Sequence, residues 1–249
     1  MALKRPMPIS SFQYPFELPH PISSMAVGVA LELGKLADHV SESELHTLYP
    51  YLKGAVFSRR LAHHGGRVCA KAAISSLLPN GCSEGEIKIG RGTAGEPIWP
   101  KGIVGSITHT DDLAYAVAAL ASDCETIGID SEICVDAGTC DDIASVCLTP
   151  LERARFLRGT TITRRWNATA IFCIKEAFYK AAYPRLRRFI EFEELEVIQL
   201  DIRSGRAFAR YIGQSPLWNQ CERVTASIVV ADRHIHAFVL SSKSTQIER

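Results

Sequence analysis

The chain has 249 residues, of which 47% are hydrophobic and 22% are charged, and its formal net charge is +1. This balance is ordinary for a soluble globular protein, and the length allows one large domain or two small ones around a substantial core. A net charge so near zero argues against bulk affinity for nucleic acid, so any basic site must be local. No apolar run reaches the roughly eighteen residues that a membrane-spanning helix needs,.

Elements of both types are expected in the first half of the chain. Ser41 caps a short helix whose first turn is acidic, and Pro79–Gly81 should stop a long helix,. Thr110–Asp112 has the composition of a hairpin turn,. In chain order we expect a strand at 25–31, helices at 41–49 and 56–78, a strand at 86–89, and a hairpin over 102–120,.

The second half predicts a similar mixture. Pro184 should end the longest helix because proline lacks a backbone N–H, and Asp232-Arg233 should turn the last hairpin,. In chain order we expect a strand at 126–133, helices at 141–147, 150–158 and 164–182, and a closing hairpin made of 224–231 and 234–240,.

A short internal match links the two long helices. Val68–Ala73 and Phe172–Ala177 share Cys, Lys and Ala in register, and each lies on the long helix that precedes a hairpin. Together with the matching order of elements, this predicts an α+β fold of two similar halves, 1–121 and 122–249. The acidic strand and the lysine-bearing helix described next both lie in the second half.

Two acidic residues alternate along the strand predicted at 126–133. Asp130 and Glu132 should point to one face and the neighbouring isoleucines to the other,. Two carboxylates side by side repel each other unless a cation lies between them, and hard divalent cations prefer oxygen ligands. The alternative is a solvated strand end.

The longest predicted helix carries Lys175, Glu176 and Lys180 beside an apolar stripe,. Glu176 and Lys180 are one turn apart, so the ordinary interpretation is a surface ion pair. Taken with the acidic strand, however, the lysines suit chemistry on a phosphorylated substrate, where metal and ammonium groups neutralise phosphate charge. Glu152, in the first turn of the preceding helix, could simply complement the helix dipole.

A basic stripe is predicted on the first long helix, where Arg60, His64, Arg67 and Lys71 share one face,. Such a stripe usually faces water, but arginine forks also suit phosphates.

Three other patterns are rejected as sites. Gly90–Gly95 matches the dinucleotide motif GxGxxG, but Pro97 and Pro100 forbid the helix that this motif must open,. The alternating His234 and His236 lack a third metal ligand and should lie at the sheet surface. The eight cysteines form no CxxC pair and no common zinc spacing, so without a secretory signal in residues 1–16 they should stay reduced in a cytoplasmic protein.

In order along the chain, five segments resemble the 4′-phosphopantetheinyl transferases, in particular their large Sfp-like and EntD-like group. Each segment alone is a weak signal, whereas five in the family's order are a strong one. The resembling segments are Phe57–Ala70, Gly95–Pro100, Gly105–His109, Gly128–Glu132 and Ile174–Lys180.

The resemblance implies a monomer of two α+β halves related by a pseudo-twofold axis, with coenzyme A in the cleft between them. It also implies the reaction, in which the phosphopantetheine arm of coenzyme A moves to a serine of an acyl or peptidyl carrier protein and adenosine 3′,5′-bisphosphate leaves. Such enzymes serve fatty-acid, polyketide, nonribosomal-peptide and siderophore pathways, and the sequence does not say which. Neither nucleic acid nor a membrane is expected as a partner.

By the same resemblance, Asp130 and Glu132 would bind Mg²⁺, with Mn²⁺ as the alternative metal. Glu176 would be the third carboxylate or the base that takes the serine proton, and Glu152 is the other candidate for third ligand. Lys175 and Lys180 would hold phosphates as charge builds on the leaving oxygen, and Lys180 would act in catalysis together with Glu176 and His109.

The remaining implied contacts are to the nucleotide of coenzyme A. Thr108 and His109 match the family's Ser-His pair and would contact its phosphates, with threonine keeping the hydroxyl. Two further departures are Ser131, where an aliphatic residue is common, and Glu96, where some relatives carry lysine. The other expected contacts are Arg59, Arg60, Arg67, Arg91, Gly95 and Pro97.

Two other functions compete with this one. A metal-dependent phosphohydrolase or nuclease would also need paired carboxylates and a lysine. A non-catalytic module that binds carrier proteins would be credible if the acidic strand or Lys175-Glu176 were missing, but both are present.

Overall fold

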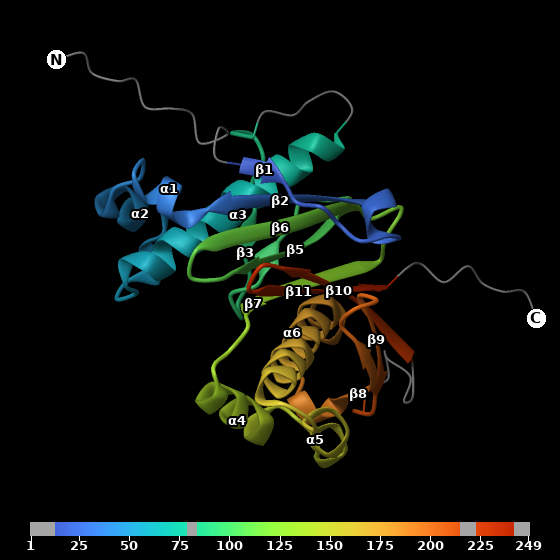
Figure 1. Ribbon diagram of the computed structural model, residues 1–249. Helices are drawn as coiled ribbons and strands as arrows, with labels where there is room; N and C mark the ends of the chain where they lie inside the picture. Colours follow the sequence, from blue (N-terminus) through green and yellow to red (C-terminus); the bar gives the residue numbers. More distant parts are fainter. Residues whose placement is uncertain (1–12, 79–83, 215–222, 242–249) are drawn as a thin grey trace, which may run out of the picture. The chain divides into compact units, whose positions relative to one another are not determined.

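The computed structural model describes residues 13–78, 84–214 and 223–241. The chain falls into two compact units, unit 1 (Met1–Ala121) and unit 2 (Ser122–Arg249). Each unit is a mixed α+β structure with an antiparallel sheet and one long helix (Figure 1). Among the helices of the described ranges, none has the length and apolarity that crossing a lipid bilayer requires.

Unit 1 is built on a four-stranded sheet in the order β1-β2-β6-β5, against which the long helix α3 packs. Its elements are β1 (Gln13–Pro15), β2 (Ala26–Glu32), α1 (Leu33–Ala37), α2 (Glu42–Leu48), α3 (Phe57–Leu77), β3 (Gly90–Arg91), β4 (Pro97–Ile98), β5 (Ile103–His109) and β6 (Leu113–Leu120), with short 3-10 turns η2 (Ile22–Ser24) and η3 (Pro50–Leu52).

Two adjacent glycines let α3 approach this sheet closely. A Cβ at Gly66 would lie 2.4 Å from the side chain of Ile107, and one at Gly65 would lie 2.9 Å from the side chain of Leu33. The pair therefore does not weaken the helix, because the packing that it permits offsets the low helix propensity of glycine.

Unit 2 is built on a five-stranded sheet in the order β7-β11-β10-β9-β8, and α6 packs on β7 and β11. Its elements are β7 (Thr126–Ile133), α4 (Ala137–Val146), α5 (Pro150–Phe156), α6 (Thr161–Leu186), η4 (Phe192–Glu194), β8 (Leu195–Asp201), β9 (Arg206–Tyr211), β10 (Arg223–Ala231) and β11 (His234–Ser241).

The two units share a chain path. In each, the first long strand (β2 or β7) pairs with the last strand (β6 or β11), which pairs with the strand before it (β5 or β10). The cysteines of the internal match also have equivalent contacts, since the thiols of Cys69 and Cys173 each donate to a carbonyl of the last strand, those of Ala114 and Ile235, both at 3.5 Å. The α+β class is confirmed, and the pseudo-twofold relation stays a prediction.

Several elements differ from those expected. Residues 86–89 form no strand, and the pairing comes later, between β3 and β4. The longest helix starts before position 164 and continues through Pro184 to Leu186, so the predicted stop is wrong. A proline in the last turn removes only one donor, and the turn ends instead at Arg187, whose φ of 50° is left-handed,. The stop predicted at Pro79–Gly81 lies outside the described residues.

Gly128 is the tightest helix–sheet contact in unit 2. A Cβ there would lie 1.9 Å from the carbonyl oxygen of Ala177 and 2.8 Å from the backbone nitrogen of Ala181. We expect Gly128→Ala to lower the free energy of unfolding by about 2 kcal/mol or more, because rigid backbone must move. Chemical denaturation of the variant and the wild type measures this difference in unfolding free energy.

Gly34→Ala is the matched control, because a Cβ at Gly34, inside α1, meets nothing within 4 Å. This variant should be neutral or about 0.5–1 kcal/mol more stable. Equal stability of the two variants would contradict the proposed close approach at Gly128.

Candidate functional site

The face of β7 that carries Asp130 is turned toward α6. Gly128, two residues earlier on the same face, touches the backbone of that helix. The Lys180 ammonium donates to Oδ1 of Asp130 at 2.7 Å, and the Asp130 carboxyl is almost fully buried. Burial raises the pKa of Glu176, and the nearby Asp130 raises it further, while Lys180 opposes both. The structure thus brings Asp130, Glu176 and Lys180 into one cluster.

The charges in this cluster hold Lys180 in its ammonium form. Burial disfavours the charged form, but the ion pair with Asp130 and the charge of Glu176 outweigh burial and raise the pKa of Lys180. Glu132 is two residues further along the same face of β7, and its charge, with that of Asp130, helps to raise the pKa of the buried Cys173 thiol on α6. Glu132 therefore lies near the cluster.

The oxygen donors of Asp130, Glu132 and Glu176 have the chemistry that a hard divalent cation prefers. Within residues 13–78, 84–214 and 223–241, however, no three carboxylate, histidine or cysteine side chains converge closely enough to form a metal site. The donor set fits Mg²⁺ by its chemistry, and its members share one face of one strand and the helix packed on it.

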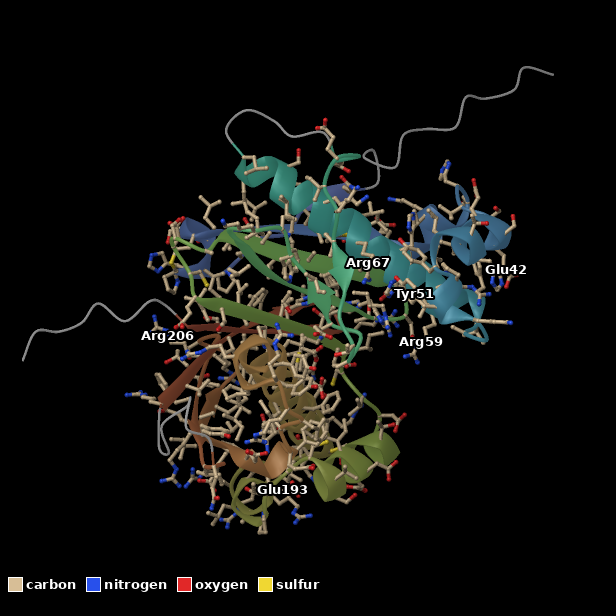
Figure 2. All side chains as sticks on the ribbon, turned by 180° about the vertical axis from the view of Figure 1, so that it is seen from behind. Glu42, Tyr51, Arg59, Arg67, Glu193 and Arg206 are labelled. Atoms are coloured by element: carbon tan, nitrogen blue, oxygen red, sulfur yellow. The ribbon has the colours of Figure 1, made fainter. Side chains whose placement is uncertain are left out.

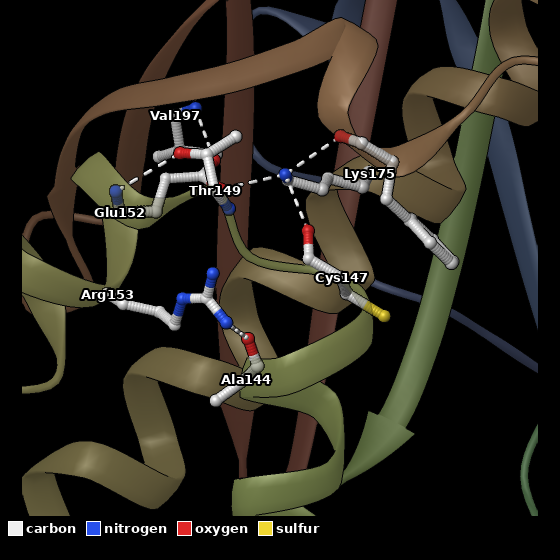
Figure 3. Close-up of polar contacts among 8 residues, drawn as sticks. Ala144, Cys147, Thr149, Glu152, Arg153, Lys175 and Val197 are labelled. Atoms are coloured by element: carbon white, nitrogen blue, oxygen red, sulfur yellow. Dashed lines mark hydrogen bonds and ion pairs between the residues drawn. The ribbon is translucent and has the colours of Figure 1, made fainter.

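Lys175 belongs to a separate network of polar contacts, drawn in Figure 3. Its ammonium donates to Oε2 of Glu152 at 2.8 Å, to the carbonyl of Cys147 at 2.8 Å and to the carbonyl of Phe192 at 2.9 Å. Burial lowers the pKa of Lys175, against the raising effect of Glu152. All three donors are used within this network, which argues against a contact between Lys175 and a coenzyme A phosphate.

Glu152 is the centre of this second network. Its Oε1 accepts from the backbone of Val197 at 2.7 Å, and its Oε2 accepts from the backbone of Thr149 at 2.7 Å as well as from Lys175. The carboxylate is fully buried and closes a capping box with Thr149 at the start of α5. These bonds leave Glu152 poorly suited to hold a metal, so they favour Glu176 as the third carboxylate.

Unit 1 contains a pocket of about 690 Å³ that gathers several of the expected nucleotide contacts. Arg59 comes from the first turn of α3, and His109 is the last residue of β5. Arg91 and Gly95 come from the β3–β4 hairpin. Figure 2 labels Arg59 and Arg67, both on α3, and Tyr51, which lies on η3. The pocket lining includes the guanidinium groups of Arg59 and Arg91 and the carboxylate of Asp111.

The other expected nucleotide contacts are not pocket-lining residues. Arg60 is buried and bound to Glu42 at 2.6 Å and to the carbonyl of Ala55, so its guanidinium serves the packing of α2 on α3. Its charge is compensated inside unit 1, which argues against a contact between Arg60 and a phosphate. Thr108 is buried and Pro97 is half-buried. Arg67 is half-buried and donates to Nδ1 of His63 at 3.1 Å.

The glycine-rich segment opens no helix, as the prolines indicated, and instead forms the β3–β4 hairpin. The backbone of Gly92 donates to the carbonyl of Glu96 at 2.8 Å, and Gly95 has a φ of 91°, which favours glycine,. A Cβ at Gly95 would lie 3.0 Å from the guanidinium of Arg91, so the glycine leaves room for that side chain.

His234 and His236 are not at the sheet surface, as was expected, but buried, with their rings stacked 6.0 Å apart. His236 Nδ1 lies 2.8 Å from the Ser131 hydroxyl. Burial lowers the pKa of His236 to about 4, and His234 contributes. Both points argue for a structural role of the pair, with His236 neutral.

Two features of the site had no signal in the sequence. A cavity of about 160 Å³ in unit 2 lies beside Glu176 and is lined by residues including Tyr179 and Phe189, of which Phe189 is exposed. In unit 1, the Arg91 guanidinium lies over the ring of Tyr51, 4.9 Å from its centre. Both arise from residues far apart in the chain, so spacing alone could not reveal them.

Comparison with known proteins decides the family. Residues 48–119 match the model of the 4′-phosphopantetheinyl transferase N-terminal domain, and residues 126–239 match that of the 4′-phosphopantetheinyl transferase superfamily. The 4′-phosphopantetheinyl transferase Npt of Nocardia iowensis is 34% identical over 180 residues, which are 71% of this chain and 76% of Npt. The chain belongs to this superfamily. It is an enzyme that modifies carrier proteins with coenzyme A as substrate.

Other relatives are matched over shorter stretches. The 4′-phosphopantetheinyl transferase PptT of Mycobacterium tuberculosis is 33% identical over 59% of this chain and 62% of its own length. Enterobactin synthase component D of Salmonella typhimurium is 30% identical over 54% of this chain and 53% of its own length. The expected family is therefore confirmed, including its EntD-like group.

Lys175 holds α6 in place through its buried ion pair with Glu152, whereas the next residue, Glu176, lies in the Asp130 cluster. The variant Lys175→Met tests the structural role of Lys175. Removing one partner of a buried ion pair leaves the other charge uncompensated, so the variant should lose about 3–5 kcal/mol of unfolding free energy. Lys71→Met is the matched control, because Lys71 occupies the equivalent register position on α3 and is half-buried. It should change stability by less than about 1 kcal/mol.

Chemical denaturation of both variants measures these changes in unfolding free energy. A Lys175→Met protein that is as stable as the wild type but no longer binds coenzyme A would restore the phosphate-binding role.

Proposed function

We propose that the cluster of Asp130, Glu132, Glu176 and Lys180 is the reaction centre for phosphopantetheine transfer. The observation that carries the proposal is the meeting of an acidic strand with a glutamate and a lysine one helical turn apart on α6. Asp130, Glu132 and Glu176 would hold Mg²⁺, or alternatively Mn²⁺. When bound, such a cation supplies charge stabilisation to the pyrophosphate of coenzyme A.

Each remaining group has a task in the displacement. The serine oxygen of the carrier protein attacks the phosphorus that bears the pantetheine arm, and the bond from that phosphorus to the adenosine 3′,5′-bisphosphate oxygen breaks. Where Glu176 is the base rather than the third metal ligand, it takes the serine proton, directly or through water. Lys180 stays charged and stabilises the phosphate oxygens as the bond breaks,.

The pocket of unit 1 would hold the nucleotide of coenzyme A. Arg59, Arg91 and His109 line it and offer N–H donors to phosphates,. Gly95 allows close approach of the ligand to the β3–β4 hairpin,. The small cavity beside Glu176 suits the pantetheine arm, since the arm is attached to the phosphorus under attack.

The proposed metal site predicts a loss of activity on removal of one ligand or of the metal. Apo-carrier proteins incubated with coenzyme A, Mg²⁺ and this enzyme should gain the mass of phosphopantetheine, as measured by mass spectrometry. Asp130→Asn should reduce the rate by at least about a hundredfold, because a neutral amide is a poor ligand for a hard cation. EDTA should have a comparable effect, reversed by added Mg²⁺.

Near-wild-type turnover of Asp130→Asn, or full activity in EDTA, would refute the metal site. Release of free phosphopantetheine without a holo-carrier product would instead favour a phosphohydrolase. Thermal unfolding of the variant checks that the buried position tolerates the amide.

Glu176 and Lys180 should affect different steps. Glu176→Gln should lower kcat by about two to four orders of magnitude and leave coenzyme A affinity within a few-fold, because it removes the base. Lys180→Ala should also weaken coenzyme A binding, since a hydrogen bond to a charged group contributes about 1.5–3 kcal/mol. Calorimetry and steady-state kinetics measure the two effects. Full kcat of the Glu176→Gln enzyme would mean that Glu176 and Lys180 form only a structural ion pair.

A further inference from the structure

A chain of hydrogen bonds in unit 1 runs from α3 to the turn η3. Arg67 donates from Nη1 to Nδ1 of His63 at 3.1 Å, and Nε2 of His63 lies 2.8 Å from the hydroxyl of Tyr51. His63 lines the pocket of about 690 Å³, and Tyr51 is about half exposed. The three residues therefore connect the interior of α3 to the side of the pocket.

The chemistry of arginine fixes the direction of this chain. A guanidinium can only donate, so Nδ1 of His63 must accept, and the neutral ring then carries its proton on Nε2. Burial lowers the pKa of His63 to about 3, and the charges of Arg67 and Arg91 add to the effect, so the ring stays neutral. Nε2 therefore donates to the oxygen of Tyr51, and the phenolic proton has to be donated elsewhere.

The same tyrosine also positions a cation of the pocket. The guanidinium of Arg91 lies over the Tyr51 ring at 4.9 Å, and its other side is close to Gly95, where a Cβ would lie 3.0 Å away. Cation–π attraction of this kind holds a guanidinium at a defined place. For the Tyr51 hydroxyl itself, His63 is the partner recorded among the described residues. Its O–H donor is thus exposed beside an arginine that is already in place.

We infer that Tyr51 is a substrate-binding residue, whose hydroxyl donates to a phosphate oxygen of coenzyme A and whose ring positions Arg91 for the same ligand. The inference rests on the proposed function, because it takes the pocket of unit 1 to hold the nucleotide. It adds a neutral donor, hydrogen-bonded to His63, beside a pocket whose lining includes the guanidinium groups of Arg59 and Arg91 as well as Asp111. A neutral donor next to a guanidinium suits an anion with several oxygens, since each oxygen can accept from a different group.

Tyr51→Phe isolates the hydroxyl, because the ring under Arg91 is kept. In the full-length enzyme with Mg²⁺, calorimetry should show coenzyme A binding weakened by about tenfold or more, the range for a hydrogen bond to a charged group. KM should rise while kcat changes by less than about threefold, because ground-state and transition-state binding are lost equally.

The matched control is Tyr49→Phe. Tyr49 also hydrogen-bonds a histidine of α3, with its hydroxyl 2.8 Å from Nδ1 of His64, but His64, unlike His63, is not a lining residue of the pocket. This variant should bind coenzyme A as the wild type does. Equal affinities of Tyr51→Phe, Tyr49→Phe and wild type would overturn the inference while leaving the proposed function intact, whereas failure of the wild type to bind coenzyme A would overturn both.

Tyr51→Leu tests the second task of the ring. It should weaken binding more than Tyr51→Phe does, and this extra loss should disappear when Arg91 is replaced by alanine in both backgrounds, since the coupling acts through that guanidinium. An extra loss that persists without Arg91 would refute the positioning role.

The phosphate that accepts from Tyr51 can be identified with 3′-dephospho-coenzyme A. If the effect of Tyr51→Phe vanishes with this ligand, the acceptor is the 3′-phosphate, and if it persists, the acceptor is the pyrophosphate. A comparable effect on adenosine, which has no phosphate, would refute phosphate contact altogether.

Discussion

The close approach of α6 to β7 is the constraint on which unit 2 depends. At Gly128 no side chain fits between the strand and the backbone of Ala177. This contact sets the distance at which Asp130, two residues further on, meets the side chains of the helix. Lys180 can therefore reach Asp130 with an ion pair of 2.7 Å, and Glu176 lies close enough to respond to its charge.

A second ion pair fixes the rotation of the same helix. Lys175 points away from Asp130 and ties α6 to the start of α5 and to the segment before β8 through Glu152, Cys147 and Phe192. Neighbouring residues on a helix point about 100° apart. When Lys175 is held inside by three acceptors, Glu176 is turned to the side of the cluster. Structural and chemical tasks are thus divided between adjacent positions.

Most of the long elements could be predicted from the sequence, because their apolar periodicity and caps are local. The strand that carries Asp130 was predicted with its observed ends, and both long helices and the closing hairpin were predicted with shifted ends. β8 and β9 were not predicted, and the stop at Pro184 was wrong, since packing of α6 outweighs one lost donor. For the site, residue types in order predicted the Asp130 cluster. The burial of Arg60 and Lys175 could not be predicted, because their partners Glu42 and Glu152 are distant in the sequence.

The thiols that join each long helix to its sheet have a consequence for an enzyme whose substrate itself carries a thiol. Burial raises the pKa of Cys69 to about 12 and holds that of Cys173 well above its usual range. Disulfide exchange needs a thiolate, and at neutral pH almost none forms at either cysteine. The enzyme can thus handle coenzyme A without forming mixed disulfides at these two positions, and the contacts that hold its helices also protect them from oxidation.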